Sequence, residues 1–253
     1  MNLFWKRLAM AGSIVWISVA VLIAEPPRSS KPSSYAPAKD LRAQVDYFLG
    51  RMEKDLQDQS QYGKDQQERI ERDASTLAAI ALVMGMHDQQ NDLKRAASNL
   101  IEASNALAGS AEDYQQAKEA LAKVKQTLAA AEQSEPVNWE PAADLVQLMK
   151  QVPIVNNSLR RGVLGRRFKR SAGRNAGYAA TLAAIAQASL ADTDYCSDEE
   201  EEAEWRKACI LMRDAAGAVN DAVHQRDQAA AKTALAQLAK SCDVCHHTFR
   251  EEN

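Results

Sequence analysis

Two cysteines and a histidine close to the C-terminal end of the sequence have the types and spacing of a haem-attachment site. Cys242, Cys245 and His246 form a Cys-x-x-Cys-His motif, in which the two thiols bond to the vinyl groups of a c-type haem. Residues three and four apart share one face of a helix. Both thiols can therefore reach one porphyrin, and the imidazole can bind its iron. The motif predicts one covalent haem c.

Three other interpretations of the motif compete with haem: a zinc site, a thiol redox pair and a chance match on a solvated tail. Structural zinc usually takes its ligands from two separated pairs, whereas this motif offers one cysteine pair beside two adjacent histidines. A thioredoxin-like pair accompanies a βαβ pattern, and the sequence predicts no strands. Adjacent helical positions point about 100° apart, so His247 is expected to be exposed. Haem is the interpretation that these considerations favour.

The composition predicts an all-α protein. The chain has 253 residues, a net charge of −3 and few glycines and prolines, and helix formers such as Ala, Leu, Gln and Glu dominate it. The net charge gives no case for nucleic-acid binding. The sequence has no Ser-His-Asp order, paired-carboxylate site or Gly-rich phosphate loop, so no enzymatic activity is predicted.

The first 24 residues resemble a signal peptide or a membrane anchor. Lys6 and Arg7 precede an uncharged, mostly apolar run from 8 to 24, which is the order of features that export signals have. The run is also close to the shortest length that spans a bilayer, so cleavage and retention are both open. Either outcome predicts a periplasmic or other extracytoplasmic protein, bound to the membrane only if the segment is retained. Residues 25–37 are rich in Pro and Ser and are predicted to form a flexible linker.

The remainder of the chain follows one plan twice. Residues 76–81 (TLAAIA) recur as 181–186, and weaker matches keep the same order, which favours a tandem duplication over a chance similarity between Ala-rich helices. Helical periodicity with short connections predicts four antiparallel helices in each copy. We therefore expect two tandem four-helix bundles, 38–133 and 142–253, joined by a linker at 134–141. The expected helices span about 38–60, 64–88, 90–109 and 111–133 in the first copy and about 141–160, 168–191, 199–226 and 228–250 in the second.

The first copy lacks the attachment residues. Extending the repeat to its end sets the three motif residues against Leu128, Ala131 and Glu132, which can neither form thioethers nor bind iron. The first bundle is therefore expected to be haem-free and to act as a spacer, a partner surface or a packing partner. Trp139 is expected to pack at the seam between the bundles.

The second copy resembles the class II c-type cytochromes, the cytochrome c prime group. The resemblance rests on Cys242, Cys245, His246, Phe249 and Arg250 at the end of an Ala-rich helix, and it extends to the first copy only through the repeat. It implies a four-helix fold with both cysteines bound to haem and His246 as the proximal iron ligand. It also implies that Phe249 packs beside the porphyrin and that Arg250 lies near its propionates.

The resemblance makes the first helix of the second copy the distal side of the iron. Met149 lies in an apolar stripe of this helix and is the candidate distal ligand, although such a methionine also suits a packed core. Aligning the family on the glycines that follow the helix places Val146 there instead, and Pro153 is expected to kink the helix. A bound methionine implies one-electron transfer, the leading function. An apolar residue implies a five-coordinate iron that binds nitric oxide or carbon monoxide, and a third alternative is a structural or interaction module of a respiratory complex.

Cys196 and Cys209, the two remaining cysteines, flank an acidic run in the second copy. In an oxidising compartment a leftover pair of cysteines predicts a disulfide, which stabilises a loop of this length by about 3 kcal/mol. The alternative is a pair of buried thiols.

A basic stretch joins the first two expected helices of the second copy, and the acidic run Asp198–Glu204 is its counterpart. Such runs are commonly solvated faces. The sharper interpretation is a docking surface for an acidic redox partner protein. Anionic lipid is a third interpretation, provided that the N-terminal segment stays in the membrane. The stretch comprises Arg160, Arg161, Arg166, Arg167, Lys169, Arg170 and Arg174.

Overall fold

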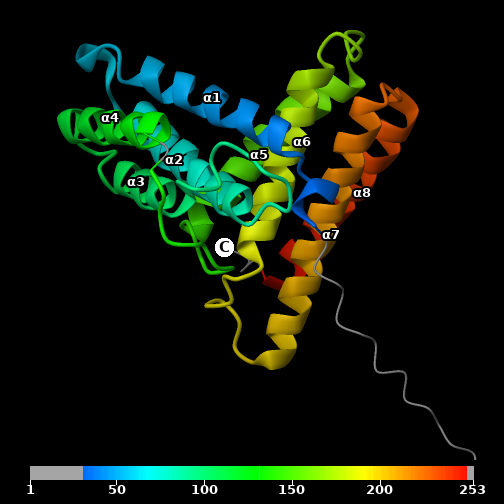
Figure 1. Ribbon diagram of the computed structural model, residues 1–253. Coiled ribbons are helices and arrows are strands. Elements are labelled where there is room, and N and C mark those ends of the chain that lie inside the picture. Colours follow the sequence, from blue (N-terminus) through cyan, green and yellow to red (C-terminus); the bar gives the residue numbers. More distant parts are fainter. Residues whose placement is uncertain (1–30, 131, 250–253) are drawn as a thin grey trace, which may run out of the picture.

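The computed structural model describes residues 31–130 and 132–249, and the regular structure in these ranges is helical without a strand. The predicted all-α class is thereby confirmed. Within these ranges, two short 3-10 turns, Pro32–Ser34 and Gln59–Gln61, accompany eight α-helices (Figure 1). The α-helices are α1 (Ala38–Asp55), α2 (Lys64–Gly85), α3 (Ala97–Gly109), α4 (Tyr114–Ala130), α5 (Leu145–Leu164), α6 (Ala172–Ser189), α7 (Glu199–His224) and α8 (Gln228–Phe249).

Four helices, α1, α2, α7 and α8, begin at the residues that the sequence predicts. Side-chain caps explain two of these starts. The carboxylate of Asp198 accepts hydrogen bonds from the backbone N–H groups of Glu200 and Glu201 at the start of α7. Asp227 accepts from two backbone N–H groups at the start of α8. Aspartate is among the preferred residues at this position because it pairs N–H groups that the helix leaves free.

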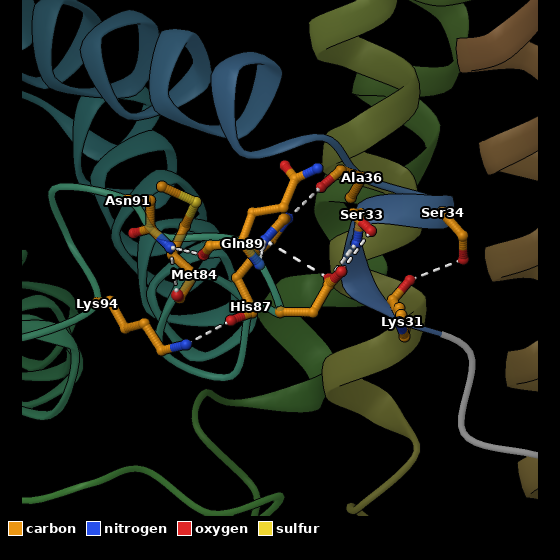
Figure 2. Close-up of polar contacts among 10 residues, drawn as sticks. Lys31, Ser33, Ser34, Ala36, Met84, His87, Gln89, Asn91 and Lys94 are labelled. Carbon is orange, nitrogen blue, oxygen red and sulfur yellow. Dashed lines mark hydrogen bonds and ion pairs between the residues drawn. The ribbon is translucent and has the colours of Figure 1, made fainter.

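The third helix begins later than predicted, at Ala97 instead of residue 90. Polar side chains hold the preceding loop in a non-helical path. Asn91 Nδ2 donates to the Met84 carbonyl at 3.0 Å, and Lys94 Nζ donates to the His87 carbonyl at 2.6 Å (Figure 2). These bonds satisfy carbonyl groups at the end of α2 and compete with continued helix.

Residues 31–37 are folded, so the predicted flexible linker is wrong over this range. Ser33 donates to the Asp88 carboxylate from its backbone nitrogen at 2.8 Å and from Oγ at 2.6 Å. The fully buried His87 places Nε2 3.2 Å from the Ala36 carbonyl, and its Nδ1 accepts from the Gln89 backbone at 3.1 Å (Figure 2). The segment is therefore bonded directly to the α2–α3 loop.

The same segment packs against α7 on its other side. Tyr35 and Ala36 are buried, and the Arg213 guanidinium lies 5.0 Å from the centre of the Tyr35 ring. A Cβ at Gly217 would lie 2.9 Å from Tyr35 Cα, so α7 needs a glycine at this close approach. The predicted signal or anchor segment 1–24, together with residues 25–30, lies outside the described residues. Among the described helices, none combines the length and the apolar composition that crossing a bilayer requires.

Two helices, α2 and α6, form the buried centre of the fold. Residues 73–84 of α2 and 175–189 of α6 are buried without interruption. A helix that is apolar all round belongs in the interior, and the many alanines let neighbouring helices approach closely. The recurring segments 76–81 and 181–186 lie in these two helices, which pack against each other.

One continuous apolar core receives side chains from all eight α-helices. In the second half α5 packs against α6 and α8, and α7 packs against the same two helices. In the first half α1 to α4 pack in chain order, while α1 also reaches α6 and α5 reaches α2 (Figure 1). Trp139 packs against a cluster of residues from α2, α5 and α6, as expected for a residue at the seam.

A carboxylate lies inside the contact between the two halves. Asp73 of α2 is fully buried. Its Oδ1 accepts from Gln151 Nε2 of α5 at 2.9 Å, and its Oδ2 lies 3.1 Å from Arg51 Nε of α1. Burial raises the pKa of Asp73 to about 6, although Arg51 and Gln151 oppose the shift. Asp73 therefore resists ionisation where three helices meet.

We expect Asp73→Asn to remove part of the pH dependence of stability. The pKa of Asp73 is about 6 in the folded chain and 3.8 in an ordinary aspartate. As the pH falls, the folded state therefore takes up the proton at a higher pH than the unfolded state does. The resulting stabilisation is full below the lower pKa and is lost as the pH rises through the higher one. Between about pH 7.5 and pH 5 the wild type should gain ~1.4 kcal/mol relative to the variant.

Urea unfolding at the two pH values measures this difference. Asp65→Asn, which removes an exposed carboxylate from the first turn of the same helix, is the matched control and should behave as the wild type does. Identical pH dependence in the wild type and Asp73→Asn would contradict the assignment.

Candidate haem-attachment site

The inner face of α8 carries both cysteines of the motif. The helix buries a stripe of residues at helical spacing that ends at Leu238 and Ser241. Cys242, Cys245 and Phe249 continue this stripe and are half-buried. The structure thus places both thiols on one side of one helix, as the spacing requires. Arg250 lies outside the described residues.

An apolar cluster, here named the motif-end cluster, covers this part of α8. It gathers side chains from the start of α5, the end of α6, the start of α7 and the end of α8, so it lies at one end of the second half. The cysteine Cys245 and the aromatic Phe249 reach it from α8, and Met149 reaches it from α5. Its buried members are Leu145, Trp205 and Cys209, and its half-buried members are Met149, Leu190, Cys196, Cys245 and Phe249.

Trp205 is the aromatic member of the cluster that the sequence analysis did not identify. Its indole Nε1 donates to the Ser189 carbonyl at 2.8 Å, which joins α7 to the end of α6. Its ring meets that of Phe249 edge to face, with 5.2 Å between the ring centres. Trp205 lies one helical turn before Cys209, so a helical pattern that places the cysteine inward also places the tryptophan inward.

His246 differs from the two cysteines because its side chain is exposed. Its ring makes no hydrogen bond with any residue in the described part of the chain, so both nitrogens can take a ligand. His247 is also exposed, as predicted. His224, in contrast, is engaged, because its Nε2 lies 2.7 Å from Asp40 Oδ2.

Two candidates for the distal position differ in their surroundings. Met149 is half-buried in the motif-end cluster with Cys245 and Phe249. Val146 is 46% exposed, so it does not face this cluster. The helix α5 runs through Pro153, which is exposed inside it. The structure therefore brings Met149, and not Val146, into the same cluster as Cys245 and Phe249.

The arrangement fits a covalent haem better than a chelated metal ion. No group of three or more His, Cys, Asp or Glu side chains in the described ranges is placed to hold a metal ion. A porphyrin needs two thiols on one face, an imidazole with a free nitrogen and apolar side chains around its ring. Cys242, Cys245 and His246 meet the first two needs, and the motif-end cluster meets the third.

The other two cysteines lie in the same cluster as unbonded thiols. Burial raises the pKa of Cys209 well above its usual range, and nearby Cys245 and Cys196 add to the shift. Burial also raises the pKa of Cys196, Cys242 and Cys245. The predicted Cys196–Cys209 disulfide stays a prediction, and membership of one cluster is consistent with it.

The two ends of the second half, α5 to α8, carry charges of opposite sign. The four glutamates of the first turn of α7 lie near the motif, one turn before Trp205. The basic stretch lies at the other end of α5, in the connection to α6 near the top of Figure 1. The 20 residues of α5 put roughly 30 Å between the two ends. A partner docked on the basic stretch would therefore lie far from the motif.

We predict that Cys209 is the slowest of the four thiols to react with iodoacetamide in reduced, haem-free protein. Only the thiolate reacts, and burial raises the pKa of Cys209 most strongly. At mildly alkaline pH it should be at least about tenfold slower than Cys242 or Cys245. Mass spectrometry of each cysteine peptide measures the rates, and equal rates in urea serve as the control. A Cys209 that reacts as fast as the motif cysteines would contradict the burial.

Comparison with known proteins gave no relative. A scan against protein-family models, a search of curated proteins and a search of solved structures each found no match for this chain. The site is accordingly interpreted from its own residues.

Proposed function

We propose that this protein is an exported c-type cytochrome that carries one covalent haem and transfers single electrons. The observation that carries the proposal is the position of Cys-x-x-Cys-His at the end of α8, with both thiols half-buried on the face that meets the motif-end cluster. Lys6, Arg7 and the apolar run that follows support export. Export matters because c-type haem is attached outside the cytoplasm.

The residues of the motif have separate roles in this proposal. The thiols of Cys242 and Cys245 would hold the haem through thioether bonds to its two vinyl groups. His246 would bind its iron through a ring nitrogen, and Phe249 and Trp205 would exclude water beside the ring. The haem would supply an iron that gains or loses one electron. A low-polarity surround such as the motif-end cluster tunes its potential.

Binding of a small gas is the second candidate, and the buried Leu145 favours it. Leu145 is the first residue of α5 and is a core member of the motif-end cluster, beside Met149. If Leu145 covers the distal side, the iron has an open position that nitric oxide or carbon monoxide can take. If Met149 covers it, the position is closed and electron transfer is the function.

We also propose that the chain consists of two tandem four-helix units, the second of which carries the haem. Reciprocal contacts support this, since α1 packs on α6 and α5 packs on α2. Gln44 and Gln151 occupy the same position counted from the start of α1 and α5. Each forms a buried hydrogen bond across the seam, with Thr181 at 3.1 Å and with Asp73 at 2.9 Å. Such reciprocity is the mark of a two-fold relation.

A redox partner protein is part of the proposal, and the motif end is the better docking surface for it. Electron transfer needs the partner close to the haem, and the motif end exposes Val244 and Tyr195 beside the glutamates of α7. A partner with a basic surface would complement these charges. The acidic partner expected for the basic stretch would instead dock at the far end.

We expect protein made in a cell that attaches c-type haem to be coloured and to keep its haem after denaturation in acid. Its mass should exceed that of the chain by one haem. Cys242→Ser with Cys245→Ser should lose the covalent haem completely, since no thioether can form. Cys196→Ser with Cys209→Ser is the matched control and should keep it. Colourless wild-type protein with free thiols at 242 and 245 would refute the cytochrome assignment.

Replacing Met149 should decide between the two functions. If Met149 binds the iron, Met149→Ala should convert a low-spin absorption spectrum to a high-spin one and create a site for carbon monoxide. Val146→Ala, on the exposed side of the same helix turn, should leave the spectrum unchanged. A wild type that is already high-spin and binds carbon monoxide would exclude Met149 as a ligand and support gas binding.

A further inference from the structure

The basic stretch stands out because nothing in the structure neutralises it. The sequence has no acidic residue between Asp144 and Asp192. All seven cations of the stretch, from Arg160 to Arg174, are exposed. None of them forms an ion pair with any residue that the structure describes, whereas cations elsewhere do, such as Arg69 with Asp55 at 2.6 Å. This surface, here named the basic tip, therefore carries seven uncompensated positive charges.

The basic tip is held in place by the fold. Val163 and Phe168 are buried beneath it. Gln228 Nε2, from the first turn of α8, donates to the Val163 carbonyl at 2.7 Å and to the Gly165 carbonyl at 3.3 Å. The connection is thus fastened to the neighbouring α7–α8 turn, and it lies at one end of the molecule (Figure 1).

An exposed apolar residue lies among these charges. Leu164, the last residue of α5, is 54% exposed between Arg161 and Arg166. A lone apolar side chain surrounded by cations suits the boundary of an anionic bilayer, where it enters the acyl region while the cations meet phosphates. Phe168 is buried, so the tip offers no aromatic ring for stacking on single-stranded nucleic acid.

We propose that the basic tip docks the protein on an anionic phospholipid surface, with Leu164 entering the headgroup layer. An acidic redox protein would gain the same charge attraction there. It would nevertheless be held roughly 30 Å from the motif, the length of α5, which does not serve electron transfer. A lipid surface does not have to lie close to the motif. Lipid bound at the tip also leaves the motif end free. The inference stands whether or not haem is attached.

The test is partitioning of the full-length protein onto vesicles of phosphatidylcholine, with and without phosphatidylglycerol. Each cation near the surface strengthens binding to anionic lipid, so the triple variant Arg166→Gln, Arg167→Gln, Arg170→Gln should bind phosphatidylglycerol vesicles on the order of 100-fold more weakly. The control triple Lys54→Gln, Lys64→Gln, Lys123→Gln removes the same charge from exposed positions of the first half and should change binding less than about twofold. Leu164→Ser should weaken binding severalfold with an unchanged salt dependence.

The comparison between the two triple variants keeps any contribution of residues 1–24 constant. Raising the salt from about 0.1 M to about 1 M should abolish the difference, since the screening length falls from about 10 Å to about 3 Å. Equal loss in the two triple variants would overturn the proposal, as would equal binding to the two kinds of vesicle. Binding of single-stranded DNA at the tip without binding of vesicles would also overturn it.

Discussion

The packing of α2 against α6 is the interaction on which the rest of this structure depends. Both helices are buried along most of their length. Helices α1, α3, α5 and α7 pack directly on one or both of them, α4 packs on α3, and α8 packs on α5 and α7. Their alanines permit close approach, and their hydroxyl groups are satisfied locally. Thr76 Oγ1 donates to the Arg72 carbonyl at 2.7 Å, and Thr181 Oγ1 donates to the Gly177 carbonyl at 3.0 Å. Such bonds let polar side chains be buried without an unpaired donor.

The packing of the central helices determines which helix ends meet at the motif end. Because α5 packs on the central helices α2 and α6, the start of α5 and the end of α6 come together, and α7 begins beside them. The bond from Trp205 to the Ser189 carbonyl joins α7 to the end of α6. The end of α8 then has an apolar surface to pack on, through Cys245 and Phe249. A C-terminal helical turn without this cover would fray, and its two thiols would lose their common orientation.

The sequence predicts the helices and the attachment residues because both signals are local. Periodicity and aspartate caps determine where α7 and α8 begin, and the cysteine spacing itself places two thiols on one face. Features that depend on distant residues could not be predicted. Residues 31–37 read as a linker, yet Tyr35 is buried because Gly217 and Arg213 of α7 meet it. The exposure of Val146 and the inward position of Met149 likewise depend on the orientation of α5 about its own axis. Contacts with neighbouring helices set this orientation, and the sequence of α5 alone does not determine it.

The separation of charge along the second half makes the two proposals, electron transfer at the motif end and lipid docking at the basic tip, compatible with one orientation of the molecule. The basic tip joins α5 to α6, and the glutamates begin α7, so the two groups lie at opposite ends of the second half. An anionic surface attracts one end and repels the other, so both forces turn the molecule the same way. In that orientation the half-buried cysteines of α8 lie at the end of the molecule that is farther from the lipid. The distance between them and the lipid surface is about the length of α5, roughly 30 Å. A soluble partner could then approach the exposed His246 and Val244 without displacing the protein from the membrane. In the first half, several cations instead pair with carboxylates, as in Arg42 with Asp46 and Asp92 or Lys125 with Glu53. Orientation is therefore a property of the half that carries the motif.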